Sequence, residues 1–194
     1  MSTLVHELVA DFHAAGQQAG VVERLRRERL SRPQTLIAVW TAEYGWINRV
    51  ITVWEGPDSA LSPLAGTEPS TDWLSTERSA RALRPRRPVR KDLLNAPLLE
   101  CRTYATHEGQ CETFVQALLD ALPHREKYSP NAGIWTSRER GHDLVWHLWA
   151  YDSLPQRMAA REGAMQDAGW AAYRAAIRPL LKGLQASLLT PVSI

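Results

Sequence analysis

The chain has 194 residues, of which 44% are hydrophobic and 23% are charged, and these proportions are typical of a globular protein. No apolar run approaches the about 18 residues that a membrane-spanning helix needs, so we expect no membrane partner. The net charge of +2 is too small to indicate nucleic-acid binding, and two cysteines are too few for a disulfide scaffold or a cysteine-based zinc site.

The start of the chain bears on localisation. Residues 1–8 contain no basic segment that leads into an apolar stretch, as a secretory signal would. Glu7 and Asp11 come too early for a mitochondrial presequence, which is rich in arginine and poor in acidic residues. We therefore expect a cytoplasmic protein in a reducing compartment.

Several stretches of the first half recur in the second half. In the first strand and the helix entry the offset is 93: Glu7 matches Glu100, Gly16 matches Gly109 and Gln17 matches Gln110. In the next two strands it is 95: Trp40 matches Trp135, Val50 matches Val145 and Trp54 matches Trp149. Trp73 matches Trp170 at an offset of 97. The offset changes only between elements, so we predict two copies of one unit, at residues 3–92 and 96–194.

Each copy is predicted to have the order β-α-β-β-α-β. The elements of the second copy are a strand at 98–105, an amphipathic helix at 111–122, hairpin strands at 131–136 and 143–151, a helix at 153–184 and a strand at 187–192. This is the ferredoxin-like unit, whose sheet has one face covered by helices and one bare face. Two copies can bury both bare faces, so we predict an α+β fold in which two such units form a pseudo-dimeric α/β barrel within one chain.

The join between the copies, residues 81–97, is basic and rich in proline. It is either a phosphate-binding patch or a solvated linker that includes a short fourth strand of the first copy. No aromatic residue lies between the charges, as a binder of single-stranded nucleic acid would need. We therefore favour the linker and expect no nucleic-acid partner.

The motifs of the second copy occur in a recognisable order. They are Leu98-Leu99-Glu100-Cys101-Arg102-Thr103-Tyr104, Gly133-x-Trp135-Thr136, the segment from His147 to Arg157, Ala176–Leu181 and Leu188–Pro191. Together they resemble the NIPSNAP family, whose first strand tends to read leucine-glutamate-x-arginine-x-tyrosine. The first copy departs from this pattern, with Val9, Asp11 and Thr52 at the positions of Arg102, Tyr104 and His147.

The resemblance implies the dimeric α/β-barrel superfamily. Its members include small-molecule oxygenases, isomerases, cyclases and heme proteins, usually as dimers. NIPSNAP members are mostly of uncertain biochemistry; some are linked to mitochondria and to the recruitment of other proteins, and bacterial ones often occur with functions of secondary metabolism. Because a fold does not fix a function, the function has to be argued from the site.

Three polar residues alternate along the first strand of the second copy. Glu100, Arg102 and Tyr104 therefore point to one face of the sheet, although the sequence leaves open which face that is. They either line a polar pocket or form a structural network in which Glu100 pairs with Arg102. In a pocket, Arg102 would bind an anionic or enolic oxygen, and Glu100 or Tyr104 would exchange a proton.

His147 lies on the third strand of the second copy, on the same face as Trp149. It is either a hydrogen-bonded core residue or a proton-transfer group, for which an ordinary histidine pKa of about 6.5 is suited. Thr52 cannot act as a base near neutral pH, so we expect any active pocket to lie in the second copy. Trp135, Trp146 and Trp149 are either core packing or an aromatic wall for a flat substrate.

Two classes of function remain open. The first is a small-molecule protein that binds or transforms an aromatic or polyketide-like metabolite, as an oxygenase, isomerase or cyclase. The second is a non-catalytic interaction protein, in which the predicted pocket would be solidly packed. Candidate catalytic residues are His147, Arg102, Tyr104 and Glu100, and candidate substrate-binding residues are Trp135, Trp149 and Arg157.

The sequence also bears on cofactors and partners. No spacing of potential ligands indicates a metal site, and no glycine-rich loop indicates a nucleotide, so we expect no cofactor. The expected partner is a small molecule. Because the pseudo-dimer already covers the bare sheet faces, we expect at most a weak homodimer.

Overall fold

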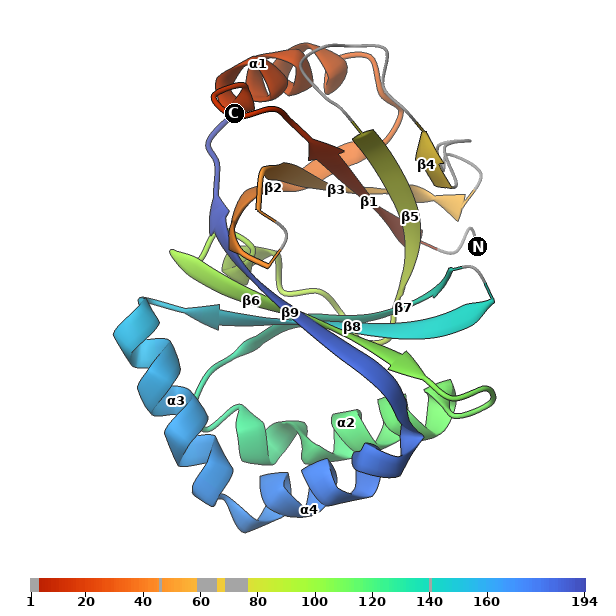
Figure 1. The fold of residues 1–194 in the computed structure, drawn as a ribbon, viewed down its shortest axis with the longest axis vertical. Helices are drawn as coiled ribbons and strands as arrows, with labels where there is room; N and C mark the ends of the chain where they lie inside the picture. The colour runs from red at the N-terminus through yellow and green to blue at the C-terminus, as the bar shows by residue number, and fades with distance from the viewer. Residues whose placement is uncertain (1–3, 46, 59–65, 69–76, 140) are drawn as a thin grey trace. The chain divides into compact units, whose positions relative to one another are not determined.

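The computed structural model describes residues 4–45, 47–58, 66–68, 77–139 and 141–194 (Figure 1). The chain divides into two compact units. Unit 1 runs from the N-terminus to Arg84 and includes Ser187–Ile194, and unit 2 is Pro85–Ala186. Compared with the predicted repeats, residues 187–194 belong to unit 1 and residues 85–92 belong to unit 2.

Unit 2 has the element order β-α-β-β-α-α-β. It contains η2 (Lys91–Leu93), β6 (Leu98–Thr106), α2 (Cys111–Arg125), β7 (Asn131–Glu139), β8 (His142–Tyr151), α3 (Leu154–Gln166), α4 (Ala168–Ile177), η3 (Arg178–Leu180) and the first part of β9 (Leu181–Pro191). Its strands lie in the order β9–β6–β8–β7, and β8 pairs antiparallel with both β6 and β7. The ferredoxin-like unit predicted for the second copy is thus present, with its second helix in two pieces.

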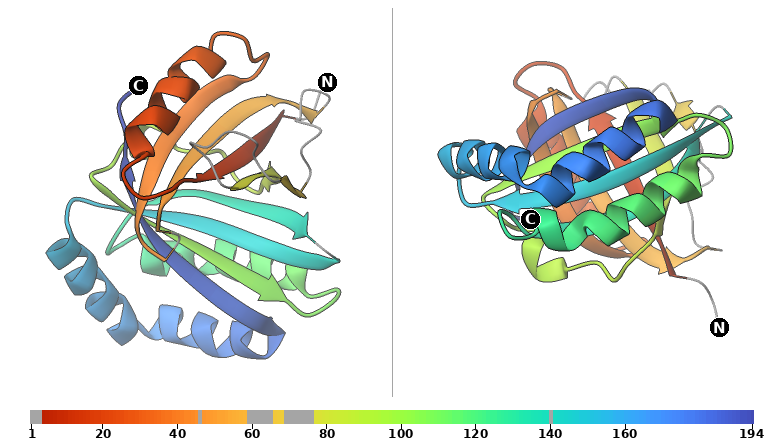
Figure 2. Two further views of the ribbon diagram at one scale, coloured as in Figure 1. Left: turned by 45° about the horizontal axis from the view of Figure 1, so that its top comes forward. Right: turned by 90° about the horizontal axis from the view of Figure 1, so that it is seen from below.

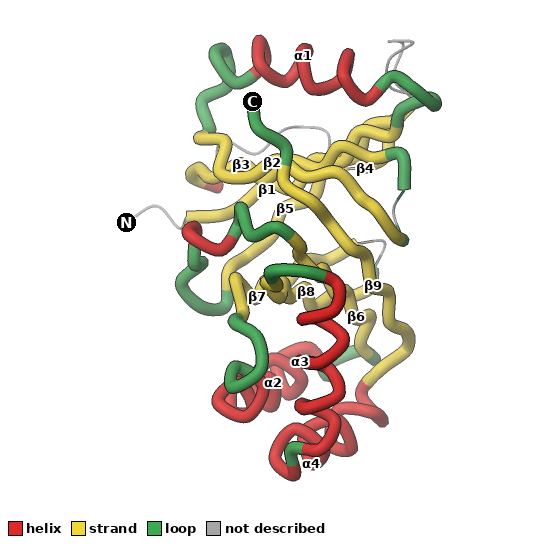
Figure 3. The backbone as a smooth tube through the Cα atoms, turned by 90° about the vertical axis from the view of Figure 1, so that its left-hand side faces the viewer, coloured by secondary structure: helices red, strands yellow, loops and turns green. Residues whose placement is uncertain are grey.

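The helices of unit 2 lie on one face of its sheet (Figures 1 and 3). Helices α2 and α4 run side by side across the strands and pack against each other (Figure 2). Their buried apolar side chains follow helical spacing: Phe114, Leu118 and Leu122 in α2, and Tyr173 and Ile177 in α4. Burial of this stripe against the sheet holds the helices in place.

The predicted helix over residues 153–184 is wrong in its extent. Asp167 leaves the helical conformation, and its carboxylate accepts a 3.0 Å hydrogen bond from the Trp170 backbone N–H, so it caps a new helix. Pro179 favours the start of a short 3-10 turn, and Gly183 weakens any helix beyond it. The last strand therefore begins at Leu181 rather than at residue 187.

Unit 1 repeats the same pattern. It contains β1 (Leu4–Phe12), α1 (Gln18–Glu28), β2 (Thr35–Tyr44), β3 (Arg49–Pro57), β4 (Gly66–Glu68) and β5 (Glu77–Pro85). Its strands lie in the order β9–β2–β3–β1–β5–β4, with the end of β9 beside β2. Most of the segment where its second helix was predicted, Trp73 included, lies outside the described residues. Strand β5 supplies the fourth strand that was expected near the join.

The strand register supports the repeat. The first and third strands of both units pair antiparallel, and matched residues lie opposite matched residues. The equivalent pairs are Glu7–Trp54 and Glu100–Trp149, and Val9–Thr52 and Arg102–His147. Unit 1 therefore shows what unit 2 looks like when the polar residues of its sheet are replaced.

The part of the basic join that belongs to unit 2 packs against the rest of that unit. Arg86 makes two hydrogen bonds of 2.5 Å to Glu112, and Arg87 makes one of 3.2 Å to Glu126. Leu94 in the same segment is buried. These two arginines are thus neutralised by carboxylates of the protein, which favours the linker interpretation.

Candidate functional site

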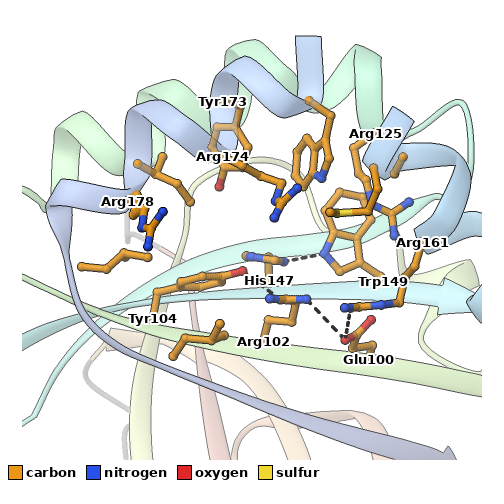
Figure 4. A pocket seen from close by; sticks show the side chains of 16 residues that line it. Glu100, Arg102, Tyr104, Arg125, His147, Trp149, Arg161, Tyr173, Arg174 and Arg178 are labelled. Atoms are coloured by element: carbon orange, nitrogen blue, oxygen red, sulfur yellow. Dashed lines mark hydrogen bonds and ion pairs between the residues drawn. The ribbon is translucent and has the colours of Figure 1, made fainter. Parts of the chain in front are cut away.

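The polar row of the second copy faces the helices. In β6 and β8, Arg102 lies opposite His147, and Glu100 lies opposite Trp149. Because side chains alternate along a strand, these four residues and Tyr104 share one face, the face that α2 and α4 cover (Figure 4). The structure thus brings together five of the seven predicted site residues and answers which face carries them.

A cavity of about 490 Å³ lies between this face and the helices, within the range of ligand pockets, about 300–1,000 Å³. The sheet supplies its floor, and α2, α3, α4 and the start of β9 supply its walls. Lining residues include Glu100, Arg102, Tyr104, Arg125, His147, Trp149, Arg161, Met165, Trp170, Tyr173, Arg174, Ile177, Arg178 and Leu184.

Glu100 is the anchor of an ion-pair network on the floor. Its carboxylate accepts hydrogen bonds from Arg157 at 2.9 and 3.2 Å, from Arg161 at 3.0 Å and from the Tyr151 hydroxyl at 3.2 Å. Burial alone would raise the pKa of Glu100, but the Arg157 hydrogen bond and the charges of Arg102, Arg157 and Arg161 hold it below its ordinary value. A carboxylate bound in this way is poorly suited to accept a proton, so the network is structural chemistry rather than acid–base chemistry.

Arg102 and Tyr104 form a second contact beside it. The Arg102 Nε donates a 2.8 Å hydrogen bond to the Tyr104 hydroxyl oxygen, and its guanidinium lies 3.5 Å from Glu100. Burial raises the pKa of Tyr104, and the nearby Arg102 offsets only part of this effect. Tyr104 is therefore a neutral phenol whose oxygen accepts from Arg102, which leaves its O–H able to donate to a ligand.

His147 is held in one tautomer by Trp149. An indole N–H can only donate, and the Trp149 Nε1 lies 2.5 Å from Nδ1 of His147. Nδ1 therefore accepts, and the proton of the neutral ring is on Nε2. In the described structure Nε2 is buried without a hydrogen-bond partner, and Figure 4 shows that side of the ring turned away from Trp149.

The surroundings of His147 oppose its protonation. Burial, followed by the charges of Arg102 and Arg125, lowers the pKa of His147 well below 6.5. The ring stays neutral, its Nδ1 lone pair is engaged, and its Nε2 carries a proton. His147 is thus arranged as a hydrogen-bond donor to the cavity, whereas a proton-transfer group of the kind considered from the sequence would need a free lone pair.

This state of His147 is directly measurable. We expect ¹⁵N NMR of the imidazole at pH 6 to show a neutral ring protonated on Nε2, with the signal assigned by its loss in His147→Thr. The unfolded chain binds this proton near pH 6.5 and the folded chain does not, so folding stability falls as the pH drops below about 6.5, by up to about 1.4 kcal/mol per pH unit. Protonation near pH 6.5, or a proton on Nδ1, would contradict the assignment.

Aromatic rings form the wall above the floor. Trp149 and Trp170 meet edge to face with centroids 6.1 Å apart, and Trp170 lies 4.5 Å from Tyr173. Burial raises the pKa of Tyr173, and its hydroxyl is buried without a partner in the described structure. The Tyr173 hydroxyl is thus a second buried polar group beside the cavity, and an oxygen atom of a ligand can accept a hydrogen bond from it.

Residues 99–194 match the NIPSNAP family model. The chain is 31% identical to a NIPSNAP domain protein of Burkholderia xenovorans, with 50% of this chain and 96% of that chain covered at a TM-score of 0.47. The chain belongs to the NIPSNAP family. A NipSnap protein of Caenorhabditis elegans is 22% identical over 210 residues, and the chain spans 40% of that protein's length.

Solved structures of tandem form share the NIPSNAP chain's fold. An anthrone oxidase-like protein has a TM-score of 0.72 at 12% identity, with 100% of this chain and 94% of that chain covered. A protein named as a candidate monooxygenase from Lactobacillus acidophilus has a TM-score of 0.65 at 11% identity, over 97% and 94%. The predicted fold class is confirmed: α+β, with two ferredoxin-like units in one chain of the dimeric α/β-barrel type.

Two predicted site residues of the NIPSNAP half lie outside the cavity lining. Trp135 lies opposite Trp146 and shares its face of the sheet, the face away from His147. Its ring occupies the space that a side chain at Gly133 would fill. Arg157 contacts Glu100 from α3 and does not reach the cavity.

Residues of α4 and its end were not predicted as site residues. Tyr173, Arg174 and Arg178 line the cavity. Tyr173 follows the apolar spacing of its helix with Ile177, and that pattern predicts a core position. These residues could have been found in the sequence as a tyrosine in an apolar helical stripe that is followed by two arginines one helical turn apart.

Comparison of the two units shows which residues around the site belong to the shared fold. Glu7, matched to Glu100, pairs with Arg32, whose guanidinium lies 4.2 Å over the Trp54 ring. Arg125 lies 4.6 Å over the matched Trp149 in the same way. The carboxylate, the tryptophan and the stacked arginine thus recur in both units, as features of the fold.

The donors of the cavity do not recur. Thr52 stands for His147, and its Oγ1 accepts a 2.8 Å hydrogen bond from the Trp54 Nε1, just as Nδ1 of His147 accepts from Trp149. The hydrogen bond to the tryptophan is therefore structural. Compared with Thr52, His147 adds one hydrogen-bonding group, the Nε2–H.

Within the described ranges, no group of three or more His, Cys, Asp or Glu side chains could hold a metal ion. No helix in the described part of the chain is long and apolar enough to cross a membrane.

Proposed function

We propose that unit 2 binds and transforms a small, flat metabolite of the aromatic or polyketide type. The observation that carries this proposal is the buried Nε2–H of His147, which lacks a partner among the described residues beside a cavity of ligand size. The alternative of a non-catalytic interaction protein expected this space to be packed, so the cavity supports the first class.

The donors suit a ligand that reacts through an enolate or phenolate. His147, Tyr104 and Tyr173 are buried neutral donors around one cavity, where such groups stabilise a developing oxyanion far better than in water. The permanent positive charge of Arg102 further stabilises such an oxyanion. The donors lower the ligand's own pKa, so water can accept the ligand's proton and the protein does not have to supply a strong base.

Three reaction classes use such an anion: isomerisation, cyclisation, and oxygenation by direct reaction with O₂. The fold shared with an anthrone oxidase-like protein and a candidate monooxygenase adds weight to oxygenation. For anthrone, one O₂ would yield anthraquinone and one water, so carbon is oxidised, O₂ is reduced and no external reductant is needed.

The proposal is tested with anthrone and 2-naphthol, and with a saturated ketone of similar size as the control. We expect the two aromatic compounds to quench tryptophan fluorescence and to slow hydrogen exchange in β8 and α4. We also expect O₂ uptake in the presence of anthrone if the reaction is oxygenation. Absence of binding, or protection confined to other elements, would contradict the proposal.

A further inference from the structure

The arginines around the cavity fall into two groups. Arg102 and Arg161 contact the Glu100 carboxylate, and Arg125 donates to the Tyr151 hydroxyl at 2.9 Å. Arg174 and Arg178 make no ion pair or hydrogen bond with other described residues. The cavity therefore has one internal carboxylate, which is already engaged, and two arginines whose charges are not neutralised by the protein.

The two arginines are placed to act together. They lie four residues apart, at the end of α4 and the start of η3, so they project from the same side of this segment. Both line the cavity, and Figure 4 shows their guanidinium groups below the helix, with Arg178 above Tyr104. Cationic side chains are favourable at the C-terminal end of any helix because of the helix dipole. That effect does not require the guanidinium groups of Arg174 and Arg178 to reach the cavity.

The apolar surroundings define the rest of the ligand. Met165 and Leu184 also line the cavity, and because they are 49% and 54% exposed they form an apolar rim. Deeper in, the Tyr104 ring stacks on His147 with centroids 5.1 Å apart. A flat ligand can thus pass from a cationic mouth, along aromatic rings, to a neutral donor at the floor.

We propose that the ligand is an aromatic acid, with a carboxylate bound by Arg174 and Arg178 and a hydroxyl or carbonyl oxygen bound by the Nε2–H of His147. This inference rests on the proposed function and narrows its substrate class. Guanidinium groups match a carboxylate in geometry and charge, whereas the floor of the cavity offers neutral donors to a less charged oxygen. The two ends of the site thereby fix the direction in which the ligand lies.

The test compares 6-hydroxy-2-naphthoate with its neutral amide, 6-hydroxy-2-naphthamide, by calorimetry at pH 7.5. We expect the wild-type protein to bind the acid about tenfold more tightly than the amide, or more. In the double variant Arg174→Met/Arg178→Met, the acid should lose this advantage while the amide binds as before. Added salt should weaken the binding of the acid only.

The control is Arg138→Met, which removes an arginine of β7 that is 70% exposed and does not line the cavity. It should leave the preference for the acid unchanged. If both probes bind with equal affinity and the double variant changes nothing, the carboxylate inference is overturned while the proposed function stands. If neither probe binds the wild-type protein, both fail.

Discussion

Glu100→Ala is expected to lower the free energy of unfolding by about 3–4 kcal/mol, the largest loss for a single residue of the site. The side chain is 1% exposed and accepts from Arg157, Arg161 and Tyr151, so its removal leaves buried donors and cationic groups without a partner. Urea unfolding measures the change. Glu112→Ala is the matched control, because Glu112 pairs with Arg86 but is 73% exposed, and it should cost under about 1 kcal/mol.

The pH dependence gives this prediction a second readout. Since the folded-state pKa of Glu100 lies below the ordinary value of 4.5, its contribution is complete above about pH 4.5 and is lost as the pH falls through the folded-state pKa. The difference between wild type and Glu100→Gln should therefore shrink in acid. Equal losses for Glu100→Ala and Glu112→Ala, or a difference that grows in acid, would show that Glu100 is not the anchor of the network.

His147→Thr is expected to abolish the specific binding of hydroxyaromatic ligands, with at least about a tenfold loss of affinity, while the fold is kept. Unit 1 already carries this arrangement: the Thr52 hydroxyl accepts from the Trp54 indole and lies 3.4 Å from the Val9 carbonyl, to which it donates. The substituted threonine can do the same with Trp149, so only the Nε2–H is lost. Far-ultraviolet circular dichroism, thermal melting and calorimetry together measure fold, stability and affinity.

The variant separates two roles that His147→Ala would mix. Alanine removes both the donor to the cavity and the acceptor for Trp149, so a loss of binding could follow from a loss of packing. A folded His147→Thr protein with unchanged affinity would remove His147 from the site. A His147→Thr protein that fails to fold would show that the ring is needed for the core.

Much of the fold follows from local pattern. The spacing of Glu7, Trp54, Glu100 and Trp149 was enough to align the two copies, and the strand register agrees with that alignment. The alternation of Glu100, Arg102 and Tyr104 was likewise enough to place them on one face. Alternation is identical for both faces, however, so the choice of face depends on helices whose packing no strand pattern contains.

The rest of the site depends on neighbours that are distant in sequence. The pKa of His147 is set by its burial and by Arg102 and Arg125, and its tautomer by Trp149. Tyr173 follows the apolar period of its helix, which predicts burial but not that its hydroxyl lacks a partner. Trp135 was expected with Trp149 in an aromatic wall because both are large rings of the sheet, but ring size does not show which face of a strand a side chain occupies.

The most direct test is diffraction from crystals of the protein grown with 6-hydroxy-2-naphthoate. We predict that the naphthalene ring lies between β8 and α4, that an oxygen lies within hydrogen-bond distance of the His147 Nε2, and that the carboxylate contacts Arg174 and Arg178. A ligand bound elsewhere on the chain, with the Nε2 of His147 still lacking a partner, would contradict the account.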